Sequence, residues 1–168
     1  ANLIQSLLSD GFQIGTDASV NTSGVVYDYI VFKASAGFLT VGSYSGNGAD
    51  NRAITGLGIS PDALFIMDGS NQEAVFSTTA DEGNAYNFNN GSAGTNHIQS
   101  LDGDGFTLGN DNRVNQSGHT YYYIAWNEMA GSMDVGSYSG TGVDNRNITG
   151  VGFQAEWLMV QAEGRDTV

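Results

Sequence analysis

Short runs of Val, Ile, Phe and Tyr alternate along this chain with clusters of Gly, Asn, Asp and Ser. Such runs are typical of β-strands, and the clusters between them are typical of turns. Residues 25–32 form the clearest run. Tyr27 and Tyr29 are expected on one face of this strand, because strand side chains alternate. Ile30 and Phe32 then lie on the opposite face, which predicts a central strand covered on both sides, by its own domain or by a neighbour.

Patterns typical of helices are nearly absent, since Gly, Asn or Asp interrupts apolar residues at helical spacing throughout the chain. Shorter apolar runs at residues 38–41, 63–67, 132–135 and 157–160 predict further strands. The 24 glycines and single proline suit many short strands joined by turns. We therefore expect an all-β protein whose antiparallel sheets pack face to face as a β-sandwich.

The chain also repeats itself. Residues 1–74 align with residues 95–168 without an insertion, and 34 of the 74 aligned positions are identical. This predicts two tandem related repeats of 94 residues, 1–94 and 95–168, of which the second is incomplete because it lacks a match for residues 75–94. Arrays of this kind usually build or bind, and they seldom catalyse.

Composition restricts the partners. The chain carries 18 acidic residues against 5 Lys and Arg, a formal net charge of −13. Nucleic acids and anionic membranes are not expected partners, because both are bound through clustered Lys and Arg. No apolar run approaches the roughly 18 residues of a membrane span, so membrane insertion is not expected. Cysteine is absent, which excludes disulfides and thiolate metal sites.

Each copy places the tripeptide Asp-Asn-Arg just after a glycine turn. We interpret the tripeptide as structural: Asp caps the turn, Asn takes a left-handed conformation, and Arg pins the loop to the next repeat. The candidate repeat-interface residues are Asp50, Arg52, Asp144 and Arg146. A carbohydrate-binding loop would use the same residue types, which leaves surface glycans as alternative partners.

Three carboxylates make a candidate calcium site. Asp102, Asp104 and Asp111 lie in a turn-rich stretch, and calcium takes several oxygen ligands from such turns. The stretch lacks the closing Glu of an EF-hand, and the first copy keeps only Asp10 and Asp17 as equivalents. Surface turn carboxylates are the commoner explanation, and no other cofactor is expected.

Asn-x-Ser/Thr sequons permit N-glycosylation where the producing cell performs it. They lie at Asn21, Asn90, Asn115 and Asn147. Asn21 and Asn115 occupy the same position in the two copies.

No catalytic residues are expected. His97 and His119 correspond to Leu3 and Val25 in the first copy and lie in no nucleophile or metalloprotease motif. No spacing singles out two carboxylates as the acid and base of a glycosidase. A polysaccharide-degrading enzyme is the most distant alternative.

Several segments carry a resemblance to a known family. They are residues 98–101, 104–109, 114–115, 117–118, 121–126, 136–140, 148–150 and 152–160, the last with Ala155 where the family has proline. With these residues the chain resembles a β-sandwich family related to concanavalin-like domains, found in phage tail and virion proteins and in prokaryotic surface proteins. The resemblance implies a jelly-roll or concanavalin-like fold, a virion or cell-surface structural role, and no transferable catalytic residue.

The resemblance also implies a division of the chain. Residues 41–126 are expected to form one complete sandwich unit, residues 1–40 the C-terminal half of a unit, and residues 127–168 the N-terminal half of a further unit. Such halves can pair within one molecule or between molecules, and pairing between molecules gives a head-to-tail polymer.

We therefore expect an extracellular, cell-surface or virion structural protein. It would form a homo-oligomer or polymer, such as a filament, appendage or tail, by strand complementation between subunits. A glycan-binding, lectin-like adhesion module is the alternative.

Overall fold

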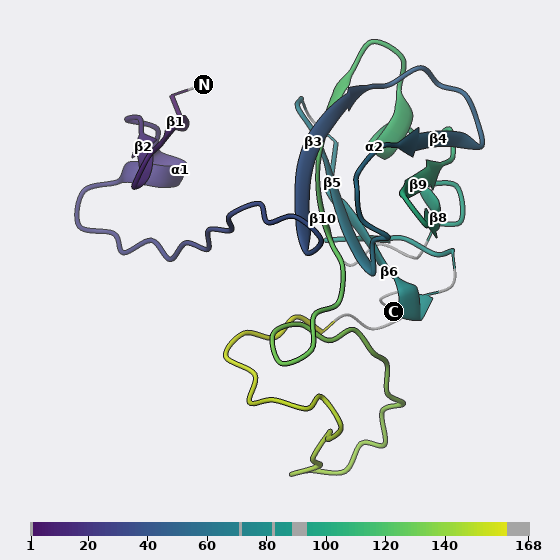
Figure 1. Ribbon diagram of the computed structural model, residues 1–168. Coiled ribbons are helices and arrows are strands. Elements are labelled where there is room, and N and C mark those ends of the chain that lie inside the picture. The colour runs from purple at the N-terminus through teal and green to yellow at the C-terminus, as the bar shows by residue number, and fades with distance from the viewer. Residues whose placement is uncertain (1, 71, 82, 89–93, 161–168) are drawn as a thin grey trace. The chain divides into compact units, whose positions relative to one another are not determined.

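The computed structural model describes residues 2–70, 72–81, 83–88 and 94–160. The chain divides into two compact units, Ala1–Phe32 and Lys33–Val168 (Figure 1). This division differs from the three segments expected from the sequence, because residues 127–160 belong to the second unit.

The first unit contains one antiparallel hairpin and one helical turn. Strands β1 (Ile4–Leu8) and β2 (Gly11–Ile14) pair with each other. Helix α1 (Ala18–Asn21) begins after Asp17, whose side chain accepts a hydrogen bond from the backbone N–H of Ser19 over 2.9 Å. This is a standard N-cap, which satisfies one of the helix's unpaired N–H groups.

Residues 25–32 follow α1 without forming a strand, so that prediction is wrong for the first unit. Tyr27 is nevertheless fixed locally, since its Oη donates to Ala18 O over 2.7 Å and accepts from the N–H of Thr22 over 3.0 Å. A strand needs a neighbouring strand to satisfy its backbone groups.

The second unit has a five-stranded and a three-stranded sheet, both antiparallel. The first has the order β3-β10-β5-β6-β7 and the second the order β4-β9-β8. The strands are β3 (Leu39–Ser45), β4 (Arg52–Thr55), β5 (Ala63–Asp68), β6 (Val75–Thr78), β7 (Tyr86–Asn87), β8 (Ile98–Asp102), β9 (Gly105–Leu108) and β10 (Thr120–Trp126). Two short helices accompany them, the 3₁₀ turn η1 (Thr79–Asp81) and α2 (Asn112–Asn115).

Strand β10 lies inside the larger sheet, between the edge strand β3 and the strand β5 (Figure 1). It pairs along its whole length with β3, and over residues 121–126 with β5. Its inward side chains include Tyr121, whose ring stacks on that of Tyr44 with 5.3 Å between centroids. Tyr121 Oη donates to Asn112 O over 2.5 Å, which joins the strand to α2.

One core cluster draws its residues from both sheets. It contains Tyr44, Leu57, Ile59, Leu64, Ile66, Val75, Ala85, Ile98, Phe106, Leu108, Val114, Tyr121 and Ala125. Burying side chains of this size contributes roughly 1.5–3 kcal/mol each. The core therefore holds the two sheets together.

The opposite face of the five-stranded sheet is also apolar, as the alternation in β10 requires. Phe65 packs edge-on against Trp126, with 4.9 Å between ring centroids, and against Phe88, with 5.3 Å. Met133 and Val135 pack against the same cluster. This face is therefore covered in part by residues that follow β10.

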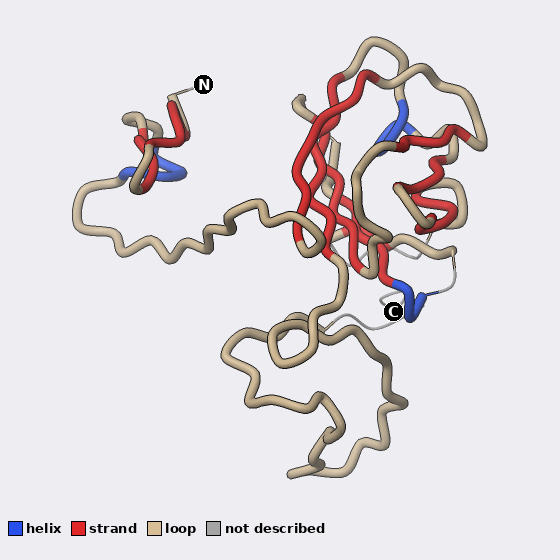
Figure 2. The backbone as a smooth tube through the Cα atoms, in the orientation of Figure 1, coloured by secondary structure: helices blue, strands red, loops and turns tan. Residues whose placement is uncertain are grey.

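Antiparallel sheets and very short helices confirm the all-β prediction. The strands of the second unit run from Leu39 to Trp126. Residues 127–160 form only an isolated bridge between Met129 and Met133 (Figure 2). The strands predicted at 132–135 and 157–160 are wrong for this reason: no partner strand pairs with them in the described chain.

The buried tyrosines predict a loss of stability in alkali. Burial raises the pKa of Tyr44 far above its ordinary value of 10.0, and burial also raises the pKa values of Tyr121 and Tyr123. The unfolded chain ionises these hydroxyls near pH 10 and the folded chain keeps them neutral. Their contribution to stability is therefore complete below about pH 10 and is lost as the pH rises further.

We expect the urea midpoint of unfolding to fall steadily above about pH 10, and to fall less steeply in Tyr44→Phe. A midpoint that is unchanged at about pH 11 would contradict this.

Candidate functional site

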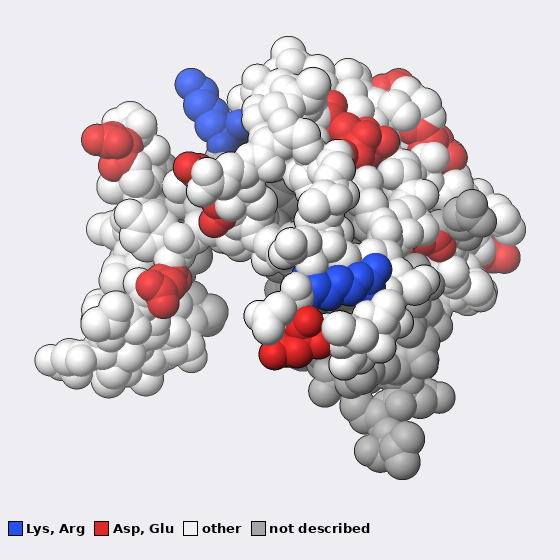
Figure 3. All heavy atoms as spheres, turned by 90° about the horizontal axis from the view of Figure 1, so that it is seen from below, with Lys and Arg blue, Asp and Glu red and all other residues white. Residues whose placement is uncertain are grey.

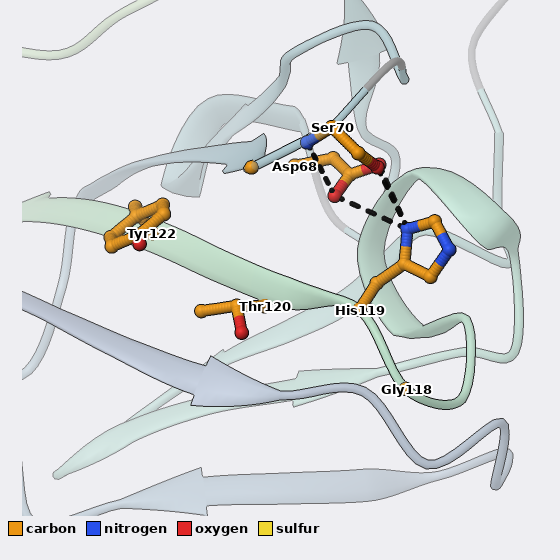
Figure 4. Close-up of a pocket in the computed structure, with 7 residues that line it drawn as sticks. Asp68, Ser70, Gly118, His119, Thr120 and Tyr122 are labelled. Atoms are coloured by element: carbon orange, nitrogen blue, oxygen red, sulfur yellow. Dashed lines mark hydrogen bonds and ion pairs between the residues drawn. The ribbon is translucent and has the colours of Figure 1, made fainter.

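Asp68, Ser70 and His119 meet in an open hollow of about 290 Å³ beside the start of β10 (Figure 4). Ser70 Oγ donates to Asp68 Oδ2 over 2.7 Å. His119 Nδ1 lies 3.0 Å from Ser70 Oγ and 3.1 Å from Asp68 Oδ2. The cluster ties the residue before β10 to the end of β5.

The same three residue types form the nucleophilic triad of many hydrolases, but the geometry here differs. In a triad one ring nitrogen of the histidine faces the carboxylate and the other faces the serine. Here Nδ1 faces both groups, and the serine hydroxyl donates to the carboxylate. The arrangement therefore differs from that of a triad and gives no specific support to nucleophilic catalysis.

A second polar cluster centres on Asn115, whose side chain is fully buried in the second unit. Its Oδ1 accepts from the N–H of Asn47 over 3.0 Å and from Arg52 Nη1 over 2.9 Å. Its Nδ2 donates to Ala49 O over 2.7 Å and to Gly109 O over 3.1 Å. The amide thus uses both hydrogens and both lone pairs, and it ties α2 to the loop between β3 and β4.

Arg52 reaches Asn115 from the Asp-Asn-Arg loop. Its guanidinium lies 5.3 Å from the ring centroid of Tyr44, and Nη1 also donates to Ser45 O over 2.6 Å. Arg52 belongs to the first sequence copy and Asn115 to the second. Their hydrogen bond is the kind of contact expected of an arginine that pins its loop to the next repeat.

The rest of that loop follows the sequence expectation in part. Asn51 has a φ of 55°, the left-handed conformation. Asp50 does not cap the turn through the backbone, and accepts instead from the side chains of Asn51 and Gln99. Because these polar groups are engaged within the unit, the loop gives no specific support to the glycan-binding alternative.

The equivalent loop in residues 127–160 has a similar local geometry. Arg146 lies over the ring of Tyr138 at 5.6 Å, and its Nη1 donates to Ser139 O. Asn145 also has a φ of 55°, and the side chain of Asp144 accepts from its N–H over 2.9 Å. The contacts given for this loop in the described part of the chain thus come from its own segment.

The two flanks, residues 1–32 and 127–160, expose side chains whose equivalent residues between β3 and β10 are buried. Tyr27 is 39% exposed whereas Tyr121 is fully buried, and Leu158 is 74% exposed whereas Leu64 is fully buried. Other exposed apolar residues of the flanks include Ile4, Leu7, Leu8, Ile14, Tyr29, Ile30, Val31, Phe32, Tyr138, Ile148, Trp157 and Val160. Exposed apolar surface of this extent usually marks an interaction site, so the flanks form the candidate interface.

The three calcium candidates have separate structural roles. Asp102 accepts from Ser100 and Thr107, and Asp104 accepts from the backbone N–H groups of residues 56 and 58. Asp111 caps α2 and lies 3.4 Å from His97 Nε2. Among the described residues no group of three or more His, Asp or Glu side chains is placed to hold a metal ion. The geometry therefore lends the calcium hypothesis no support.

The sequons lie in different environments. Asn115 is fully buried and both of its amide hydrogens are donated, so the prediction of a glycan at Asn115 is wrong for the folded unit. Asn21 and Asn147 are exposed and stay candidates. Asn90 lies outside the described residues.

Sequence analysis missed the role of Asn115. The available signal was that Asn21 and Asn115 are identical in the two copies, as Arg52 and Arg146 are. The cluster around His119 had no such signal, because the equivalent residue is Val25.

The burial of Asn115 predicts a large effect of its removal. Asn115→Ala removes all four hydrogen bonds of a fully buried amide, including the one from Arg52 Nη1, so the free energy of unfolding should fall by about 3 kcal/mol or more. Asn112→Ala changes an exposed side chain on the same helix and should cost within about 0.5 kcal/mol. Equal losses in the two variants, measured by urea unfolding, would show that Asn115 does not organise the unit.

None of the helices in the described residues has the length and apolar character needed to cross a membrane. No curated protein matches the chain, and no solved structure matches it. A family model described as "Domain of unknown function (DUF7483)" matches residues 33–136. This match spans the whole of β3 to β10 and more than half of the chain. The chain therefore belongs to the DUF7483 family.

Proposed function

We propose that this chain is a structural protein that self-assembles by strand complementation between copies. Residues 25–32 of one copy take the place of β10, and residues 133–139 and 157–160 of the next copy take the places of β3 and β5. We call the place where these segments of two copies meet the assembly joint. The joint and the second unit are then both sandwiches of the concanavalin-like type. The product is a filament, appendage or tail-like polymer in an extracellular, cell-surface or virion setting.

The observation that carries the proposal is the unequal burial of equivalent residues. Leu64 and Tyr121 are fully buried in adjacent strands of the second unit, and their equivalents Leu158 and Tyr27 are exposed. The first flank carries the equivalent of β10, and the other flank carries the equivalents of its two neighbours, β3 and β5. Pairing them would bury apolar surface and satisfy backbone groups in one step.

The direction of growth follows from the difference between the flanks. Each flank complements the other kind and does not complement itself. A contact between two different surfaces is heterologous, and such contacts build open filaments when the rotation does not close.

Charge sets the conditions for assembly. Acidic side chains are spread over the face shown in Figure 3, with few basic ones, and the formal net charge is −13. Copies therefore repel one another at low ionic strength, and salt screens this repulsion. Assembly experiments belong at physiological ionic strength or above.

A cysteine cross-link tests the proposed register. In the second unit Ile124 lies opposite Val41, so Ile30 of one copy is expected opposite Val135 of another. The chain has no cysteine, and facing residues of paired strands lie within disulfide range. An equal mixture of Ile30→Cys and Val135→Cys chains should therefore give disulfide-linked heterodimers on non-reducing gels.

The control mixture pairs Ile30→Cys with Val143→Cys, an exposed residue of the neighbouring loop, and should cross-link far less. Equal cross-linking in both mixtures would contradict the register. Sedimentation showing a compact monomer at high protein concentration would refute the assembly itself.

A further inference from the structure

The Asn115 cluster has its two halves preserved in the two flanks. In the second unit the amide of Asn115 makes four hydrogen bonds, one within its own hairpin and helix segment, to Gly109 O, and three to the segment 47–52. These three bonds join parts of the unit that are far apart in the sequence. They are among the polar contacts between the two sequence copies.

The first flank keeps the Asn side of this cluster. Asn21 donates from Nδ2 to Gly15 O over 2.8 Å, as Asn115 does to Gly109 O. The hairpin β1–β2 has the same register as β8–β9, with Ile4 opposite Ile14 where Ile98 lies opposite Leu108. Asn21 is therefore held in the orientation of Asn115, yet it is exposed.

The other flank keeps the Arg side. Arg146 repeats the two contacts of Arg52, over a tyrosine ring and onto a serine carbonyl. Gly142 has a φ of 69° where Gly48 has 72°, so the backbone that faces Asn115 in the second unit has the same turn here. The equivalents of Asn47 N–H and Ala49 O are the N–H of Thr141 and the carbonyl of Val143.

We propose that Asn21 of one copy is the polar lock of the assembly joint and binds Arg146 of the next copy. Its Oδ1 accepts from Arg146 Nη1 and from the N–H of Thr141, and its Nδ2 donates to Val143 O. The lock rests on the proposed assembly by strand complementation and names the residues that fix its register. A purely apolar joint could slip, whereas a buried amide with four fixed partners allows one alignment.

The lock also makes Asn21 a point of control. The sequon Asn21-Thr22-Ser23 would place a glycan on Nδ2, the same atom that donates to Val143 O in the joint. A chain glycosylated at Asn21 therefore cannot offer this flank to a neighbour, and it ends a growing polymer.

The test uses Asn21→Ala and Arg146→Ala chains, each measured for its critical concentration of assembly by sedimentation. Each variant should raise that concentration at least about tenfold. Asn21→Ala removes the acceptor of the Arg146 guanidinium, and Arg146→Ala removes the charged donor to the Asn21 amide. Arg113→Ala is the control, because it removes the same charge from a residue outside the joint and should leave the critical concentration within about twofold.

Mixing the two variants gives the decisive result. An Asn21→Ala chain keeps Arg146, and an Arg146→Ala chain keeps Asn21, so one native joint per pair of chains can form. The mixture should yield heterodimers at concentrations where neither variant associates alone. Thermal unfolding of the second unit should be the same in the Asn21→Ala and Arg146→Ala chains, since neither Asn21 nor Arg146 contacts its core.

Three outcomes separate the lock from the assembly. If the native chain assembles and Asn21→Ala assembles at the same concentration, the lock is wrong and the assembly stands. If the mixture gives no heterodimer while the native chain polymerises, the lock is also wrong. If the native chain stays monomeric under all these conditions, both proposals fail.

Discussion

The structure depends on one strand that has to be covered on every side. Strand β10 presents apolar side chains on both faces and hydrogen-bonding groups on both edges, and it meets these demands only between β3 and β5. Its position decides the sheet order, the stacking of Tyr121 on Tyr44, and the link to α2. The smaller sheet then closes one face, and residues after β10 cover part of the other.

Equivalent segments of the two sequence copies have different structures within one chain. The comparison distinguishes contacts that are local in the sequence from contacts between distant residues. Tyr27 and Tyr121 bond to their helical turns in the same way, and Arg52 and Arg146 lie over tyrosine rings alike. These contacts involve residues close in the sequence. The pairing of β10 with β3 and β5 joins distant residues, and residues 25–32, the equivalent of β10, pair with no strand in the described chain. Turns, caps and hairpins therefore form from local sequence alone, whereas strands require a partner.

This distinction also explains what could be predicted from the sequence. The strands at 38–41 and 63–67, the left-handed Asn51 and the all-β class follow from local patterns, and the structure bears them out. The strands expected at 25–32, 132–135 and 157–160 fail, because the pattern describes a strand and cannot say whether its neighbours are present. The cluster around Asn115 needs four groups from two distant segments, so no local pattern could reveal it. Asp68, Ser70 and His119 likewise meet only after β5 and β10 have paired.

The order of the strands has a consequence for the kinetics of folding. Strand β10 is the last strand of its unit to be synthesised, so β3 and β5 can pair with it only after the whole of that segment has been made. This pairing closes a long loop, which is a slow step in the folding of β proteins. Residues 25–32 share the Tyr-x-Tyr-Ile motif of β10 and leave the ribosome earlier, which makes them a competitor for the same place. His119, which bonds to Ser70 and Asp68, corresponds to Val25 in that competitor. The cluster of Asp68, Ser70 and His119 thus stabilises β10 in this position and would not stabilise residues 25–32, which lack the histidine.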